Sequence, residues 1–207
     1  MKSYAESKKL PFEKLKGSSE KAISIHHDKL YEGYVKKYQE IQEKLKTVDK
    51  SLANATYSEL RELKLEETFA ANGVLLHEAY FDMLGLPAEA SAEAGGDGKP
   101  EGEVIEALAK EFGSFENWQE EFKVMGMAAR GWVILVYDFN DGKFHNYLAD
   151  FHNQGGIWGA APLLVLDVYE HAYFIDYGSD RKSYIEDFFS NLNWKAINEK
   201  YLKMINR

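Results

Sequence analysis

The first half of the chain carries apolar residues at helical spacing. Over residues 18–45 the apolar positions recur in steps of three, four or seven, and a second run over residues 58–84 behaves in the same way. Two long helices are therefore predicted, and the short connection between them favours an antiparallel hairpin. Gly73 lies inside the second helix, where it costs about 1 kcal/mol relative to Ala. We therefore expect a packing or functional reason for this glycine.

The second half of the chain has a different pattern. Residues 86–102 are rich in Gly, Pro and Ala, which is typical of a loop or linker. We place a domain boundary there, with a helical hairpin domain over residues 1–88 and an α+β domain over residues 89–207. Further helices are predicted at residues 104–112, 115–129, 182–191 and 194–205.

Three segments between these helices have the composition of strands. Residues 132–139 (WVILVYDF) are rich in β-branched and aromatic side chains, and residues 140–143 (NDGK) are typical of a hairpin turn. Return strands are predicted at residues 143–151 and 162–169. The predicted fold class is α+β, with a three-stranded antiparallel sheet in the second domain.

Composition narrows the classes of function. The chain has 207 residues, 25 Lys and Arg against 34 Asp and Glu, a net charge of -9 and no cysteine. The acidic balance argues against a nucleic-acid partner. Without cysteine, a metal site must use nitrogen and oxygen ligands. No apolar run reaches the roughly 18 residues of a membrane span, and the start lacks an apolar leader, so a cytoplasmic protein without a membrane partner is expected.

The histidines offer the first candidate chemistry. His26 and His77 fall in the two long helices, and His171 follows Asp167 by four residues. On a helix, Asp167 and His171 would lie on the same face. At the end of a strand, a turn would bring them together. Three imidazoles and one carboxylate suit manganese, iron, cobalt or zinc, although at such spacing these residues are more often ordinary core or surface positions. Three other polar residues have simple structural interpretations. Gln154 would be a loop amide, and Lys29 and Arg181 would lie on a solvated face.

Taken in order, several segments resemble the iron/manganese superoxide dismutase family. The strongest match is residues 166–173 (LDVYEHAY), against the family signature Asp-x-Trp-Glu-His-Ala-Tyr. The other matching segments are residues 10–12, 25–29, 34–35, 131–132, 183–185 and 193–194. The resemblance covers nearly the whole chain.

The resemblance implies a metal site and an activity. The implied ligands of one manganese or iron ion are His26, His77, Asp167 and His171, with water or hydroxide in a fifth place. Superoxide would be the substrate, converted to oxygen and hydrogen peroxide by redox cycling of the metal.

The resemblance also implies roles around the metal. Tyr34 and Gln154 match the pair that hydrogen-bonds toward the metal-bound solvent, and Trp132 would wall the pocket. Glu170 matches a residue that reaches the partner subunit's ligand histidine, and Tyr173 matches an interface tyrosine. A homodimer is therefore expected, or two dimers joined as a tetramer.

The source of the active-site amide divides the family. One type has Gln four residues before the ligand histidine of the second helix, and the other has Gly there and Gln in the loop after the sheet hairpin. Gly73 and Gln154 match the second type, which favours manganese. The Gln154 amide is then expected to fill the space above Gly73.

Departures from the family lie in the pocket wall and the substrate gateway. Leu30 replaces a gateway histidine, so Tyr173 is expected to lose a hydrogen bond, and Phe81 and Tyr169 replace tryptophans. One alternative is therefore a divergent metal-binding protein with little or no dismutase activity. Another alternative, a non-haem iron oxygenase, would need a pocket for an organic substrate.

Two residues match gateway cations of the family: Lys29 and Arg181. These cations would guide an anionic substrate toward the site despite the net negative charge of the chain.

Overall fold

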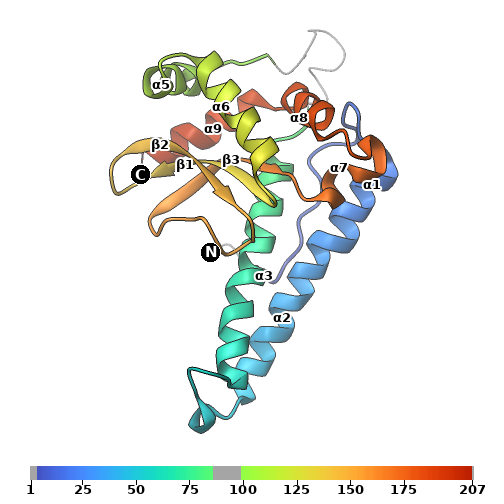
Figure 1. Ribbon diagram of the computed structural model, residues 1–207, viewed down its shortest axis with the longest axis vertical. Helices are drawn as coiled ribbons and strands as arrows, with labels where there is room; N and C mark the ends of the chain where they lie inside the picture. The colour runs from blue at the N-terminus through green and yellow to red at the C-terminus, as the bar shows by residue number, and fades with distance from the viewer. Residues whose placement is uncertain (1–3, 86–98, 207) are drawn as a thin grey trace.

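The computed structural model describes residues 4–85 and 99–206, and its helical and sheet-containing parts are packed together (Figure 1). The predicted boundary between residues 88 and 89, like most of the predicted linker, lies outside the described residues. The α+β fold class and the three-stranded antiparallel sheet are confirmed.

The first part is the predicted helical hairpin. Its first arm runs through α1 (Glu20–Ser24), a π-helical segment η1 (Ile25–Tyr31) and α2 (Glu32–Thr47), and its second arm is α3 (Glu59–Asp82). A short 3₁₀ turn, η2 (Lys50–Leu52), lies between the arms. Serine side chains cap both arms, since Ser19 accepts from the Ala22 amide and Ser58 from the Arg61 amide. In Figure 1 the two arms lie side by side, with α3 nearer the sheet.

The second part builds the sheet among helices. Helices α5 (Glu103–Phe112) and α6 (Phe115–Ala128) precede strands β1 (Trp132–Asp138), β2 (Lys143–Ala149) and β3 (Ala160–Asp167). The strand order is β2-β1-β3, and both pairs are antiparallel. Helices α7 (Glu170–Tyr177), α8 (Arg181–Ser190) and α9 (Trp194–Ile205) follow.

The core joins the two parts. Helix α3 packs on β3, and α6 packs on β1. Trp118, Trp132 and residues 163–166 have no exposed surface. Five consecutive buried residues begin β1, so both faces of this strand are covered. This packing holds the end of β3 against the long hairpin. Among the described residues, no helix is both long and apolar enough to cross a membrane.

Candidate metal centre

Four side chains from four elements meet where the hairpin packs against the end of the sheet. His26 comes from η1, His77 from α3, Asp167 from the last position of β3, and His171 from α7. Asp167 Oδ2 lies 3.1 Å from His26 Nε2, 3.1 Å from His171 Nε2 and 3.8 Å from His77 Nε2. One potential ligand atom from each residue lies within 4.8 Å of the other three. The structure thus brings together the four residues expected to be ligands.

The turn after β3 explains how Asp167 and His171 meet. The Tyr169 amide donates to Asp167 Oδ1 at 2.9 Å, and α7 begins one residue later. Of the two arrangements left open by the four-residue spacing, the strand-end turn is the one present. Helix α7 was not predicted from the sequence, because it has eight residues, follows the strand closely and has no side-chain cap at Tyr169.

The ligand candidate of the first arm lies in the π-helical segment. Such widened turns are rare and occur frequently at functional sites. Two consecutive histidines are buried in this segment, but only His26 faces the cluster. The His27 nitrogens lie 2.7 Å from Asp28 Oδ1 and 2.7 Å from the Lys8 carbonyl, so that ring has other partners.

His77 provides a direct test of whether a metal fits. Its Nδ1 lies 2.6 Å from the Gly73 carbonyl oxygen, which can only accept, so the proton must be on Nδ1. The lone pair of Nε2 therefore points to the cluster, where it is fully buried and has no hydrogen-bond partner among the residues that the structure describes. An unsatisfied buried acceptor costs roughly 1–3 kcal/mol. A cation among the four residues would satisfy this lone pair.

The electrostatics of the cluster are consistent with cation binding. Burial lowers the pKa of both His26 and His77, so these imidazoles are neutral. Burial alone would raise the pKa of Asp167, but the charge and hydrogen bond of His171 outweigh it and hold that pKa well below its usual range. Metal ligands require neutral imidazoles and an ionised carboxylate. Burial lowers the pKa of His171, but the charge and hydrogen bond of Asp167 outweigh burial and raise it, so His171 would release a proton when a cation binds.

A fourth histidine, His152, completes the wall of the site, and the sequence did not identify its role. The Trp132 indole donates from Nε1 to His152 Nδ1 at 3.0 Å. Because indole can only donate, the proton of neutral His152 is on Nε2. Burial lowers the pKa of His152 to about 4, so the ring is neutral near pH 7. Its centroid lies 4.7 Å from that of Tyr34 and 5.9 Å from that of His77.

The expected position of Gln154 is not the one observed. Gln154 is exposed and lines a surface hollow, so the structure does not bring its amide to the metal cluster. The space above Gly73 is filled by Tyr34, since a Cβ on this glycine would lie 2.8 Å from the tyrosine ring. The buried place beside Trp132 belongs to His152. The one clue in the sequence was that this loop holds two other polar side chains, His152 and Asn153.

The two aromatic replacements still form walls. The Phe81 ring centroid lies 5.0 Å from that of His26. Tyr169 stacks on His171 at 5.4 Å, and its hydroxyl donates to the Asp150 carbonyl at 2.9 Å. Tyr169 therefore covers one side of the ligand ring and is itself anchored to the loop after β2.

The gateway candidates are arranged differently from one another. Arg181 donates from Nε to the Tyr173 hydroxyl at 3.1 Å and from Nη1 to the Ala129 carbonyl at 2.9 Å. The hydrogen bond that Tyr173 was expected to lose through Leu30 is thus replaced by one from Arg181. Leu30 is half-buried. The other gateway cation, Lys29, is exposed, and so is the dimer-interface candidate Glu170.

Three imidazoles and one carboxylate, of which only His171 is partly exposed, are typical of proteins with a transition-metal site. Comparisons with known proteins narrow the class. Residues 100–200 match the sequence model of the C-terminal domain of iron/manganese superoxide dismutases. The chain is 43% identical over 192 residues to "Superoxide dismutase [Fe]" of Aquifex pyrophilus, which covers 91% of this chain and 86% of that protein.

Further relatives carry either metal in their names. "Superoxide dismutase [Fe]" of Cupriavidus metallidurans is 39% identical, over 91% of this chain and 90% of that protein. "Superoxide dismutase [Mn] 1" of Halobacterium salinarum is 33% identical, over 88% of this chain and 86% of that protein. The chain belongs to the iron/manganese superoxide dismutase family.

Proposed function

We propose that this protein is a superoxide dismutase, which converts superoxide to oxygen and hydrogen peroxide with one iron or manganese ion per subunit. The carrying observation is the orphaned Nε2 of His77, which faces the carboxylate of Asp167 together with the imidazoles of His26 and His171. These four residues would hold the ion. When bound, the ion would supply one-electron redox chemistry between its +3 and +2 states.

The remaining side chains handle protons and position. Burial, then the nearby carboxylate of Asp167, raises the pKa of Tyr34, so its phenol remains a proton donor at neutral pH. Trp132 holds the proton of His152 on Nε2, which makes this imidazole a second fixed donor. We assign to Tyr34 and His152 the role first expected of Tyr34 and Gln154: both donate hydrogen bonds beside the metal, and the phenol of Tyr34 relays protons. Such neighbours set ligand orientation and redox potential.

The relatives named above use iron or manganese, and we propose manganese for this chain. Manganese was favoured because Gly73 and Gln154 match one type of the family, and this preference stays a prediction. The position of Gln154 at the surface gives it no support. Metal analysis of protein produced with equal iron and manganese, combined with the activity of each metal form, tests the preference.

Two alternatives predict different results. A divergent metal-binding protein would hold the ion and show no activity. An iron oxygenase would need room for an organic substrate beside the metal ligands. The test is whether metal-loaded protein suppresses a superoxide-dependent dye reduction; the absence of suppression with both metals would overturn the proposal.

The proposed assembly is a homodimer through Glu170 and Tyr173. Glu170 is exposed at the start of α7, next to His171 in sequence, so a partner could contact it. The Glu170→Ala variant should elute later than the parent at low concentration, and an unchanged elution volume would contradict this interface. The cytoplasmic location stays a prediction from sequence, which cell fractionation tests.

A further inference from the structure

One lysine of the N-terminal segment contacts both arms of the helical hairpin. This segment precedes α1 and runs beside the hairpin (Figure 1). The Lys8 amide donates to the Tyr31 hydroxyl at 2.8 Å, and the Lys8 carbonyl accepts from His27 Nε2 at 2.7 Å, so its backbone is fixed on η1. The Lys8 ammonium lies 3.1 Å from Glu78 Oε2 and 3.1 Å from Asp82 Oδ2, both on α3. We call these contacts the Lys8 clamp.

The main partner of the ammonium is a buried carboxylate. Glu78 is 2% exposed, and its other oxygen, Oε1, accepts from the Tyr31 hydroxyl at 3.0 Å. A buried carboxylate destabilises the fold unless a cation and hydrogen-bond donors satisfy it. The Asp82 side chain is 41% exposed, and such exposed pairs contribute little. The buried pair of Lys8 and Glu78 therefore fixes the N-terminal segment against α3.

Three residues of the clamp lie next to ligand candidates. His27 follows His26 directly in η1, and Glu78 follows His77 directly in α3. The Tyr31 ring is buried, with its centroid 5.1 Å from that of His27 and 6.4 Å from that of His77. Neighbours of this kind orient ligand rings, and their loss typically costs roughly 10–100-fold in metal affinity.

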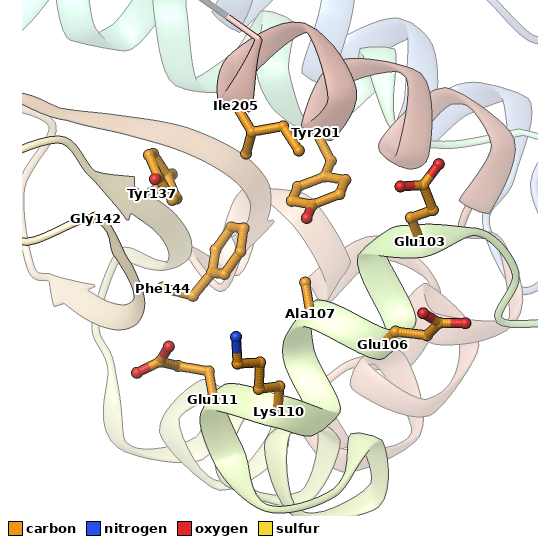
Figure 2. A pocket seen from close by; sticks show the side chains of 10 residues that line it. All are labelled: Glu103, Glu106, Ala107, Lys110, Glu111, Tyr137, Gly142, Phe144, Tyr201 and Ile205. Atoms are coloured by element: carbon orange, nitrogen blue, oxygen red, sulfur yellow. The ribbon is translucent and has the colours of Figure 1, made fainter.

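Acidic surroundings alone do not fix a lysine in this protein. Lys110 of α5 lines a surface hollow together with three glutamates, as Figure 2 shows: Glu103, Glu106 and Glu111. Within the part of the chain that the structure describes, Lys110 forms no ion pair with any of them. Lys8 differs, because its backbone is anchored on η1 while its side chain reaches α3.

We propose that Lys8 is a positioning residue of the metal centre, which holds the two ligand-bearing arms of the hairpin at the spacing that a metal ion requires. The inference rests on the ligand assignment of the proposed function, through His26 and His77. The ammonium and the metal are both cations, so by charge alone the loss of the ammonium would strengthen metal binding. Loss of the clamp weakens metal binding, and the sign of the effect separates the two.

The first test measures affinity for manganese(II) by competition with a chelator. Lys8→Met removes the charge and should weaken binding on the order of 10-fold, whereas Lys8→Arg retains a cation and should lie closer to the parent. Lys16→Met is the matched control and should leave the affinity unchanged. Lys16 belongs to the same segment and pairs with Asp187 of α8 at 2.8 Å, away from both ligand-bearing arms.

A second variant tests whether the two charges act together. Glu78→Gln keeps an acceptor for the Tyr31 hydroxyl and removes the charge, so it breaks the same ion pair as Lys8→Met. In the Glu78→Gln background, Lys8→Met should therefore have no further effect, because substitutions that break one interaction are not additive. This comparison also holds if Lys8→Met alone leaves Glu78 buried without its cation and does not fold.

The electron paramagnetic resonance spectrum of the iron(III) form gives a readout that a general loss of stability does not move, because it responds to the arrangement of the ligands. Lys8→Met should change this spectrum, and Lys16→Met should not. An unchanged spectrum, an affinity of Lys8→Met equal to or above that of the parent, or independent effects in the double variant would overturn the clamp and leave the ligand assignment intact. A parent protein that binds no metal would overturn both.

Discussion

At the scale of the residue, the tautomers of two histidines determine what the site can do. The Gly73 carbonyl holds the proton of His77 on Nδ1, which leaves Nε2 as a ligand atom. The Trp132 indole holds the proton of His152 on Nε2, which leaves a donor. One partner thus makes an imidazole a metal ligand, and another makes an imidazole a hydrogen-bond donor.

The family resemblance identified the four ligand candidates. The spacing of Asp167 and His171 also pointed to a site, because both residues lie within one local turn. His152 was missed for a physical reason. Its assignment depends on a contact with Trp132, twenty residues away, across the edge of the sheet. Gln154 has the residue type that the family pattern requires, but the loop points that residue outward.

The first prediction concerns the carboxylate. Asp167→Asn removes the one charge among the ligand candidates, so metal content should fall from about one ion per chain to below a tenth. His145→Ala is the control, because His145 pairs with Asp141 in the hairpin turn and lies outside the four ligand candidates. Elemental analysis after purification with added metal measures both variants. Full metal retention in Asp167→Asn would refute the ligand assignment.

A second prediction separates the two loop residues. His152→Ala removes the donor beside Tyr34, so activity should fall on the order of 10-fold while most of the metal stays bound, in line with the effect of losing such neighbours. Gln154→Ala should leave activity within about 2-fold. Activity per bound metal distinguishes the cases, and the reverse ranking would restore the role first expected of Gln154.

At the scale of the element, the long hairpin is what the periodicity predicted, but its first arm is not one regular helix. The π-helical segment from Ile25 to Tyr31 interrupts it, and apolar spacing cannot distinguish a widened turn from an α-helical one. The close approach of the two arms shows at Gly73, where the ring of Tyr34 takes the place of a side chain. The strands were predictable from their β-branched and aromatic side chains, whereas the short α7 was not.

Two glycines of the hairpin provide a matched pair for the third prediction. Gly73→Ala places a methyl group 2.8 Å from the Tyr34 ring, and should destabilise the protein by about 1–3 kcal/mol. Gly33→Ala in α2 meets nothing within 4 Å, and should stabilise it by about 0.5–1 kcal/mol. Urea unfolding of the metal-loaded proteins gives both values. Equal effects would show that the two arms are not in close contact at Gly73.

At the scale of the whole molecule, the metal would join two parts of the chain. Two ligand candidates come from the hairpin, and two come from the end of the sheet and the helix after it. The net charge of -9 acts over the same scale, since it repels an anionic substrate. Lys29 and Arg181 are proposed to offset that repulsion near the site, with Arg181 held in place by Tyr173 and Ala129.

The fourth prediction follows from this bridging. A metal that binds only the folded state stabilises it by about 2.7 kcal/mol at a free concentration 100 times its dissociation constant. For a chain of this size, the melting temperature should then rise by roughly 5–10 °C on loading. Calorimetry of the metal-free and loaded proteins measures the rise, and Asp167→Asn should show none. An equal rise in Asp167→Asn would mean that the metal binds elsewhere.

The fifth prediction concerns the approach of the substrate. If Lys29 and Arg181 attract superoxide, kcat/KM should fall as salt rises from 0.01 to 0.15 M, since the screening length shortens from about 30 to about 8 Å. Lys29→Glu should lower kcat/KM further than Lys36→Glu, a control seven residues further along the same arm, where Lys36 is paired with Glu32. A rate that stays flat or rises with salt would contradict steering by these cations.

The most direct test of the central claim is the rate of superoxide removal by protein loaded with iron or with manganese, followed by pulse radiolysis. We expect at least one metal form to remove superoxide catalytically, with many turnovers per metal ion, and Asp167→Asn prepared in the same way to be inactive. Stoichiometric bound metal without turnover in either form would contradict the assignment as a dismutase and leave a metal-binding protein of the same fold.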